Sequence, residues 1–198
     1  MPTHTEAWRV YLERHGIAPL DVEGRMHGRR NDEIVSHYFG LNLPAADVFN
    51  HGAAKEALFR EMIGANLHGH IVKGVVDFLN RHADTPTGLA SNAEPANIDF
   101  VLDIAGLRTH FDVVVDGHQV DRPKPFPDIY LRAAELLGFS PEMCIVFEDS
   151  PTGIEAALGA GTRVVAVQTH TSALPEVDFS IRDFSDPALD SWLASLAV

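Results

Sequence analysis

The sequence contains a single cysteine, Cys144, and no apolar stretch that approaches the roughly 20 residues of a transmembrane helix. One cysteine excludes an internal disulfide framework and suits a reducing compartment, so we expect a cytoplasmic protein. The N-terminus also lacks the basic and apolar regions of a signal peptide. Basic residues are scarce, since 15 Lys and Arg stand against 28 Asp and Glu, a formal net charge of −13. No basic cluster exceeds the pair Arg29-Arg30, so neither nucleic acid nor an anionic membrane is an expected partner.

The spacing of apolar residues changes near residue 70. Residues 1–69 show helical spacing and no convincing strand, which predicts a small bundle of helices. From residue 70 onward, helical patterns alternate with short apolar runs. These runs predict strands at 87–90, 112–115, 144–147 and 163–167. The alternation predicts an α/β fold for residues 70–198, in which helices flank a parallel, Rossmann-like sheet.

Two adjacent acids, Glu148 and Asp149, follow directly after the apolar run 144–147. In an α/β chain, side chains at the carboxyl end of a strand lie in the crevice where ligands bind. Paired carboxylates suit a hard cation such as Mg²⁺, which prefers oxygen ligands. The alternative is that both acids only decorate the N-terminus of a helix. Because the apolar run leads straight into the pair, we favour a partly buried Mg²⁺ site there.

Two further segments are candidates for binding an anion. Ser91 and Asn92 end the first predicted strand, where a hydroxyl and free backbone N–H groups at a helix start form an anion site. Ser91 is also explained as a simple N-cap, and the two roles are compatible. Lys124 lies among three prolines, which stiffen its loop. An ammonium on such a loop suits a phosphate, although a solvated surface lysine remains the alternative.

These segments together resemble the haloacid dehalogenase-like phosphatase superfamily, specifically its β-phosphoglucomutase-like branch. The resemblance covers nearly the whole chain, and residues 1–69, including Gly28-Arg29, resemble the helical cap of that branch. The motifs that carry it have the family's order and spacing: Leu89-Ala90-Ser91-Asn92, Lys124-Pro125-Phe126-Pro127-Asp128 and Phe147-Glu148-Asp149-Ser150-Pro151-Thr152-Gly153.

The resemblance implies a role for each candidate residue. Ser91 and Asn92 would bind the phosphoryl group, and Lys124 would neutralise its charge. Glu148 and Asp149 would hold Mg²⁺. These roles agree with the chemistry, because phosphoryl transfer depends mainly on positioning and charge stabilisation. The expected substrate is a small phosphorylated molecule.

One motif of that family is missing. Its first strand ends in Asp-x-Asp-Gly, whose first Asp attacks phosphorus and whose second serves as acid and base, and this sequence contains no such motif. The resemblance therefore implies a truncated member that lacks the nucleophile and the central strand of the sheet. Each backbone group left buried and unpaired beside the gap would cost about 1–3 kcal/mol. The chain must close the gap, fill it with its own N-terminal segment or pair with another subunit, and we expect a homodimer with exchanged or intertwined elements.

Other residues are candidates to replace the missing carboxylates. Metal-activated water needs no protein nucleophile. Asp116 and Asp121 lie close in sequence to Lys124 and are the candidate substitute acids, although each is also explained as a solvated loop acid. His4 and His27 are weaker candidates, since packing or surface positions explain both.

Three functions stay open on the sequence alone. The first is a metal-dependent phosphoester hydrolase, with di- and triesters among its conceivable substrates. The second is an inactive binding or regulatory protein that retains the fold. The third is an ordinary phosphatase whose start was placed at an internal methionine. The retained phosphate-binding and metal-binding residues favour the hydrolase.

Overall fold

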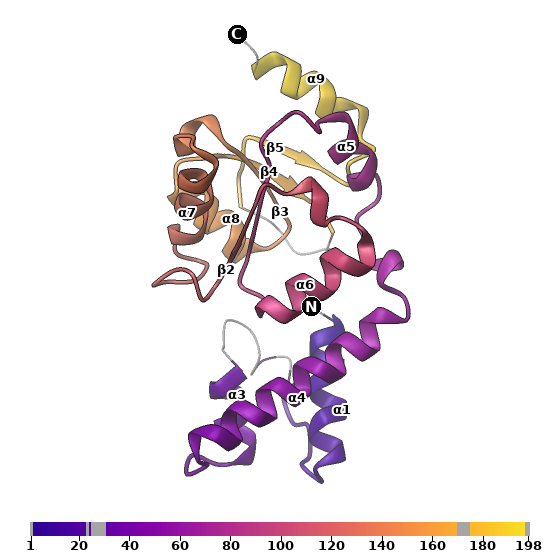
Figure 1. Cartoon of the computed structure of the whole chain (residues 1–198), viewed down its shortest axis with the longest axis vertical. Helices are drawn as coiled ribbons and strands as arrows, with labels where there is room; N and C mark the ends of the chain where they lie inside the picture. The colour runs from indigo at the N-terminus through magenta and orange to yellow at the C-terminus, as the bar shows by residue number, and fades with distance from the viewer. Residues whose placement is uncertain (1, 23, 25–30, 170–174, 197–198) are drawn as a thin grey trace. The chain divides into compact units, whose positions relative to one another are not determined.

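The computed structural model describes residues 2–22, 24, 31–169 and 175–196. His27 and the Gly28-Arg29 pair lie outside these residues. The chain divides into two compact units, Met1–Gly69 (unit 1) and His70–Val198 (unit 2) (Figure 1). Within the described ranges, no helix has both the length and the apolar character needed to cross a membrane.

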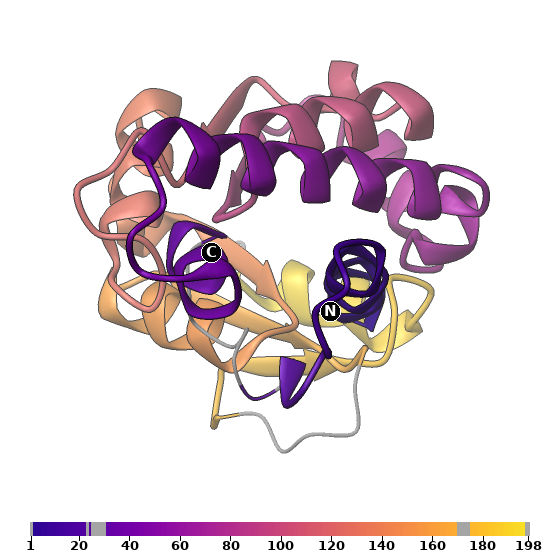
Figure 2. The ribbon, with the colours of Figure 1, turned by 90° about the horizontal axis from the view of Figure 1, so that it is seen from below.

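The described part of unit 1 contains helices and turns and no strand. Its helices are α1 (Pro2–Arg14), α3 (Asn31–Phe39) and α4 (Ala45–Gly64), and a 3-10 turn, η1 (Leu67–His70), follows. Helix α4 runs across α1: Figure 2 shows α4 along its length and α1 nearly end-on. The core is a cluster of buried apolar side chains: Trp8, Tyr11, Leu12, Val22, Ile34, Val35 and Leu58. Spacings of three and four residues put the α1 members of this cluster on one helix face.

Unit 2 alternates helices and strands as the apolar pattern predicts. Its strands are β1 (Gly88–Ser91), β2 (Val113–Asp116), β3 (Ile145–Glu148), β4 (Arg163–Val167) and β5 (Phe179–Ile181). Its α-helices are α5 (Val75–Arg81), α6 (Pro95–Ala105), α7 (Asp128–Leu137), α8 (Pro151–Gly159) and α9 (Pro187–Leu196). Two 3-10 turns, η2 (Arg108–His110) and η3 (Pro141–Met143), complete the order.

The first three strands begin and end one residue later than predicted, and β5 was not predicted. At the start of β1 and β2, the Asp112 N–H donates to the Thr87 carbonyl at 2.8 Å, and the Asp112 carboxylate accepts the N–H of Thr87 at 2.8 Å. At the other end, Ser91 pairs with Asp116 and Glu148 pairs with Ala166. The candidate residues Ser91 and Glu148 are therefore the last residues of their strands.

The strands form two sheets, not one. β1 pairs with β2, and β3, β4 and β5 form a second sheet in that order; every pairing is parallel. In the part of the chain that the structure describes, no strand pairs with the second edge of β1 or of β3. All four residues of β1 and of β3 are only partly buried, whereas four of the five in β4 are buried. Two open edges explain this exposure.

Side chains alternate between two layers of helices. Val164 and Ala166 of β4 join the cluster formed with α7 and α8, while Val165 and Val167 join the cluster formed with α5 and α9. Figure 1 shows α7 and α8 on one side of the strands and α5 on the other. Val146 of β3 packs on the α7–α8 side. Because successive strand residues point to opposite faces, Glu148 points to the same side as Val146, toward α7.

Candidate active site

The ammonium group of Lys124 joins three separate elements of unit 2. Its Nζ donates to the Ala90 carbonyl of β1 at 3.1 Å, to the Tyr130 hydroxyl of α7 at 2.8 Å and to Oε1 of Glu148 at the end of β3 at 2.5 Å. The Lys124 and Glu148 side chains are each only 9% exposed. An ammonium has three protons, and here each has an acceptor. Lys124 therefore connects the open edges of the two sheets.

The Glu148 carboxylate accepts five hydrogen bonds. Oε1 accepts from Lys124 and from the Tyr130 hydroxyl, the latter at 2.6 Å. Oε2 accepts from the Asp149 N–H at 3.0 Å, the Ser150 N–H at 3.1 Å and the Ser150 hydroxyl at 3.0 Å. Burial raises the pKa of Glu148, but the charge of Lys124 and the hydrogen bonds from Lys124, Tyr130 and Ser150 outweigh it and lower the pKa overall. Burial and the neighbouring Glu148 charge raise the pKa of Tyr130.

The turn from β3 into α8 holds this carboxylate in place. Ser150 is the N-cap of α8, and its hydroxyl accepts the Gly153 N–H at 3.0 Å. A Cβ added to Gly153 would lie 2.0 Å from the Glu148 carboxyl carbon, so any side chain at 153 would collide with it. The Ser-Pro-Thr-Gly sequence of this turn thus caps the helix and leaves room for Glu148 beneath it.

Asn92 connects the end of β1 to the lysine loop. Its Oδ1 accepts the Lys124 N–H at 3.2 Å, and its Nδ2 donates to the Lys124 carbonyl at 3.2 Å. Next to it, the Ser91 hydroxyl accepts the Ala93 N–H at 3.1 Å, but Ser91 is not the N-cap of α6, which is Glu94. Ser91, Asn92 and Lys124, predicted together from motifs about 30 residues apart, are therefore adjacent in the structure. Asn92 orients the backbone of the loop.

The other predicted acids lie differently. Oδ2 of Asp149 accepts from the Thr169 hydroxyl at 2.7 Å, next to the end of β4. Asp116 is 8% exposed, and its carboxylate accepts from the His118 N–H and the Gln119 side chain, which shapes the turn after β2. Asp121 is exposed. In the described residues, no hydrogen bond joins Asp121 to Lys124 or Glu148.

His4 belongs to a buried polar cluster of unit 1. Its ring stacks on Phe59, with centroids 3.7 Å apart. The Lys55 ammonium, on a residue only 1% exposed, contacts Nδ1 of His4 at 3.4 Å and pairs with Glu56. Burial, followed by the Lys55 charge, lowers the pKa of His4 from 6.5 to about 4. His4 is therefore neutral at pH 7.

A magnesium ion fits only one member of the predicted metal pair. Across the described ranges, no three His, Cys, Asp or Glu side chains are grouped so as to hold a metal ion. Five donors already occupy the two oxygens of Glu148, so this carboxylate does not fit a metal ligand as it stands. Asp149 fits by donor type and position, and Mg²⁺ usually binds through one or two carboxylates together with water and substrate oxygens.

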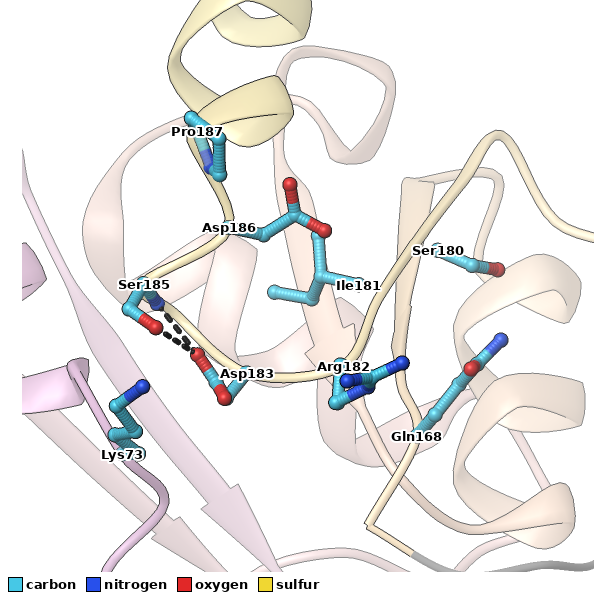
Figure 3. A pocket seen from close by; sticks show the side chains of 9 residues that line it. All are labelled: Lys73, Gln168, Ser180, Ile181, Arg182, Asp183, Ser185, Asp186 and Pro187. Atoms are coloured by element: carbon cyan, nitrogen blue, oxygen red, sulfur yellow. Dashed lines mark hydrogen bonds between the residues drawn. The ribbon is translucent and has the colours of Figure 1, made fainter.

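A polar pocket of about 500 Å³ lies beyond the carboxyl ends of β4 and β5 (Figure 3). Figure 3 shows Lys73 and Arg182 on either side of Asp183, whose carboxylate accepts from the Ser185 N–H and hydroxyl. The Asp186 carboxylate accepts a backbone N–H of α9. Two cations and two carboxylates give this lining no net formal charge, so we assign the pocket no role in anion binding. It is lined by Lys73, Gln168, Ser180, Ile181, Arg182, Asp183, Ser185, Asp186 and Pro187.

Sequence reasoning missed three partners in the site. They are the Tyr130 hydroxyl, the Ala90 carbonyl and the Thr169 hydroxyl. Tyr130 follows the prolines of the lysine loop by one helical turn, and a buried phenol needs a hydrogen-bond partner, which was the available signal. The other two carry no signal in the sequence.

Comparison with known proteins identifies the family. Residues 4–161 match the model of the haloacid dehalogenase-like hydrolases. Hexitol phosphatase A of Escherichia coli (strain K12) is 35% identical over 182 residues, which cover 90% of this chain and 82% of that protein. Fructose-1-phosphate phosphatase YqaB of the same strain is 33% identical over 171 residues, covering 84% of this chain and 88% of that protein.

Solved structures show the same fold. A HAD hydrolase of family IA, variant 3, from Entamoeba histolytica superposes with a TM-score of 0.81 at 24% identity, covering 98% of this chain and 92% of that chain. The β-phosphoglucomutase of Clostridium difficile gives a TM-score of 0.79 at 20% identity, covering 100% and 92%. At these identities the structures show the fold alone, and the family match over residues 4–161 confirms the superfamily indicated by the three motifs. The chain belongs to the haloacid dehalogenase-like hydrolase family.

Proposed function

We propose that this protein is a phosphoester hydrolase that acts on small phosphorylated substrates. The observation that carries the proposal is the meeting of Ser91, Asn92 and Lys124 at one end of β1, through the paired hydrogen bonds of Asn92. A hydroxyl, a helix start and an ammonium at one place are suited to a phosphoryl group. Relatives that are phosphatases of hexitol phosphates and fructose 1-phosphate support the same substrate class.

Each residue has a physical task in this proposal. Ser91 and the N–H groups that follow it bind phosphoryl oxygens at the start of α6. Lys124 balances their charge, and Glu148 keeps Lys124 in position. Asp149 would hold Mg²⁺, which when bound would supply further positive charge to the phosphoryl oxygens. The helical unit 1 is the proposed cap, and the cytoplasm is the proposed compartment.

The attacking group in this proposal is water. We place two candidate acids near it. Asp116 is the register partner of Ser91 on the neighbouring parallel strand, so both residues end their strands on the same face of the sheet. Asp121, exposed in the loop before Lys124, is the second. Hydrolysis by water forms no covalent enzyme intermediate, so di- and triesters are open to this route as well as monoesters.

The open edges of β1 and β3 support a proposal about assembly. A missing central strand would leave two such sheets in unit 2, and among the described residues the Lys124 ammonium reaches from one sheet to the other. Free strand edges invite pairing with another chain. We propose a homodimer in which exchanged elements occupy this gap. Light scattering should give twice the chain mass of 21.6 kDa; a monomeric mass at all concentrations would remove the proposal.

An aryl phosphate assay tests the activity. Purified protein is compared with and without Mg²⁺, alongside Asp149→Ala and a control, Asp84→Ala, which removes an exposed acid of the same unit. Metal-dependent turnover that Asp149→Ala abolishes and Asp84→Ala retains supports the proposal. Turnover that survives Asp149→Ala identifies a contaminant or another site.

A binding protein without turnover is the second candidate. The observation that favours it is the occupied state of Glu148, which removes one of the two predicted metal ligands. A folded protein that binds inorganic phosphate yet hydrolyses none of a panel of mono-, di- and triesters would establish this alternative.

A further inference from the structure

The three hydrogen bonds of Lys124 are not equivalent. Glu148 is charged, and its bond to Nζ is 2.5 Å long. The Tyr130 hydroxyl lies at 2.8 Å, and the Ala90 carbonyl, a neutral acceptor, is the most distant at 3.1 Å. An incoming anion can reach the ammonium only by replacing one of these acceptors. The Ala90 carbonyl is the one that yields most easily, because its bond is the longest and a charged acceptor makes a stronger one.

Replacement at Ala90 would put the anion at the proposed phosphate site. Ala90 immediately precedes Ser91, so the ammonium proton now directed at its carbonyl points to the carboxyl end of β1. The protons directed at Tyr130 and Glu148 point toward α7 and β3. Only the first of the three directions leads to the hydroxyl and the helix start that the proposed function assigns to the phosphoryl group.

Tyr130 has contacts that hold the ammonium in this orientation. Its hydroxyl accepts from Lys124 and donates to the same Glu148 oxygen that Lys124 contacts, so three hydrogen bonds link the three side chains in a closed cycle. Its aromatic ring also lies under the ammonium, with Nζ 4.7 Å from the ring centroid. Tyr130 is 7% exposed and sits in the cluster between α7 and the sheets, so its position is fixed by packing.

We propose that Tyr130 is a positioning residue for anion binding. By engaging two sides of the Lys124 ammonium together with Glu148, it keeps the third N–H on the end of β1, where a phosphate oxygen takes the place of the Ala90 carbonyl. The inference rests on the proposed function for the location of the phosphate. In this role Tyr130 does not contact the substrate directly but acts through Lys124.

The lysine content makes the ammonium directly observable. The chain has three lysines, Lys55, Lys73 and Lys124. In protein labelled with ¹⁵N-lysine, buried and hydrogen-bonded ammonium groups exchange slowly with water, so Lys55 and Lys124 should give side-chain signals while the exposed Lys73 should not. Loss of one signal in Lys124→Arg assigns it. Titration with inorganic phosphate should shift the Lys124 signal and leave the Lys55 signal, an internal control, unchanged.

Tyr130→Phe is the test of the positioning role. It removes one hydroxyl and keeps the ring, and Tyr11→Phe is the matched control, since it removes a buried hydroxyl bonded to His51 in unit 1. We expect Tyr130→Phe to broaden the Lys124 signal and weaken phosphate binding about tenfold, the loss typical of one hydrogen bond to a charged group. In turnover, KM should rise and kcat should change less. Tyr11→Phe should match the wild type in each measurement.

The outcomes separate this inference from the proposed activity. Phosphate affinity in Tyr130→Phe equal to the wild-type value, or phosphate binding that leaves the Lys124 signal unmoved, overturns the positioning role whether or not esters are hydrolysed. Phosphate binding with the expected tyrosine dependence supports the positioning role. If no ester is hydrolysed in that case, the activity fails and the role of Tyr130 stands.

Discussion

Replacing Lys124 with methionine should destabilise unit 2 by about 3 kcal/mol. Lys124 and Glu148 are each 9% exposed, and removing one member of a buried ion pair typically costs about 3–5 kcal/mol. The lower end applies because Glu148 keeps four donors, from Tyr130, Asp149 and Ser150. Since a domain has only about 5–15 kcal/mol of stability, this is a large fraction.

Urea unfolding measures the change. Trp192 stacks on Phe179 of β5 with centroids 5.2 Å apart, so in a Trp8→Phe background the fluorescence reports on unit 2 alone. With a slope of about 2 kcal/mol per molar urea, the midpoint for Lys124→Met should fall by about 1.5 M. Lys73→Met, at an exposed lysine of the same unit, is the control and should shift the unfolding free energy by less than about 0.5 kcal/mol.

A double-mutant cycle decides whether the pair itself is responsible. Glu148→Gln should also cost about 3 kcal/mol, because it leaves the ammonium buried without its counter-ion. If the stabilisation comes from the interaction between the two residues, the double variant Lys124→Met/Glu148→Gln should lose less unfolding free energy than the sum of the two single variants. The coupling energy should be about 2 kcal/mol. Additivity within about 0.5 kcal/mol would refute the reasoning, since it would mean that each side chain contributes independently.

Three further changes test other contacts. Gly153→Ala should cost about 2–3 kcal/mol in urea unfolding, because its methyl group would collide with the Glu148 carboxylate; an unchanged midpoint would contradict the close approach. Ser150→Ala should cost about 1 kcal/mol in the same assay through loss of the N-cap, and a loss below about 0.3 kcal/mol would show that the cap is replaced by water. The lowered pKa of His4 predicts pH-dependent stability of unit 1: the neutral ring is favoured in the folded state, so stability is full above pH 6.5 and falls by up to about 3 kcal/mol as the pH drops to about 4. Unfolding followed by circular dichroism should show a smaller loss of stability over this pH range for His4→Gln than for the wild type. An equal loss in the two proteins would contradict the burial of His4.

Most strands were predictable because apolar runs ending in polar residues are distinctive. Strand β5, Phe179–Ile181, was missed because three residues with a serine in the middle form no such run. Its contribution comes from pairing with β4 and from Ile181 in the core, which are tertiary effects. The division into two sheets could not be derived from local pattern either, since it depends on which edges meet.

The candidate site, like the fold, could be predicted only in part from the sequence. Ser91, Asn92 and Lys124 were grouped from their motifs, and the structure brings them together. Glu148 and Asp149 look equivalent in the sequence, but strand alternation turns Glu148 toward α7, where Lys124 and Tyr130 engage it, while Asp149 contacts Thr169. Two neighbouring carboxylates thus acquire different partners from a single step along the strand.

The backbone bond between the Phe184 N–H and the Lys73 carbonyl, 3.0 Å long, has a consequence for synthesis of the chain. It joins residues separated by about 110 positions, and the Gly74 backbone beside it packs against Phe184 and Ser185 so closely that a Cβ would lie 2.7 Å from the Ser185 nitrogen. Unit 2 cannot close until nearly all of its residues have left the ribosome, whereas the helices of unit 1 rely on contacts available much earlier. We expect unit 1 to fold during translation and to precede unit 2.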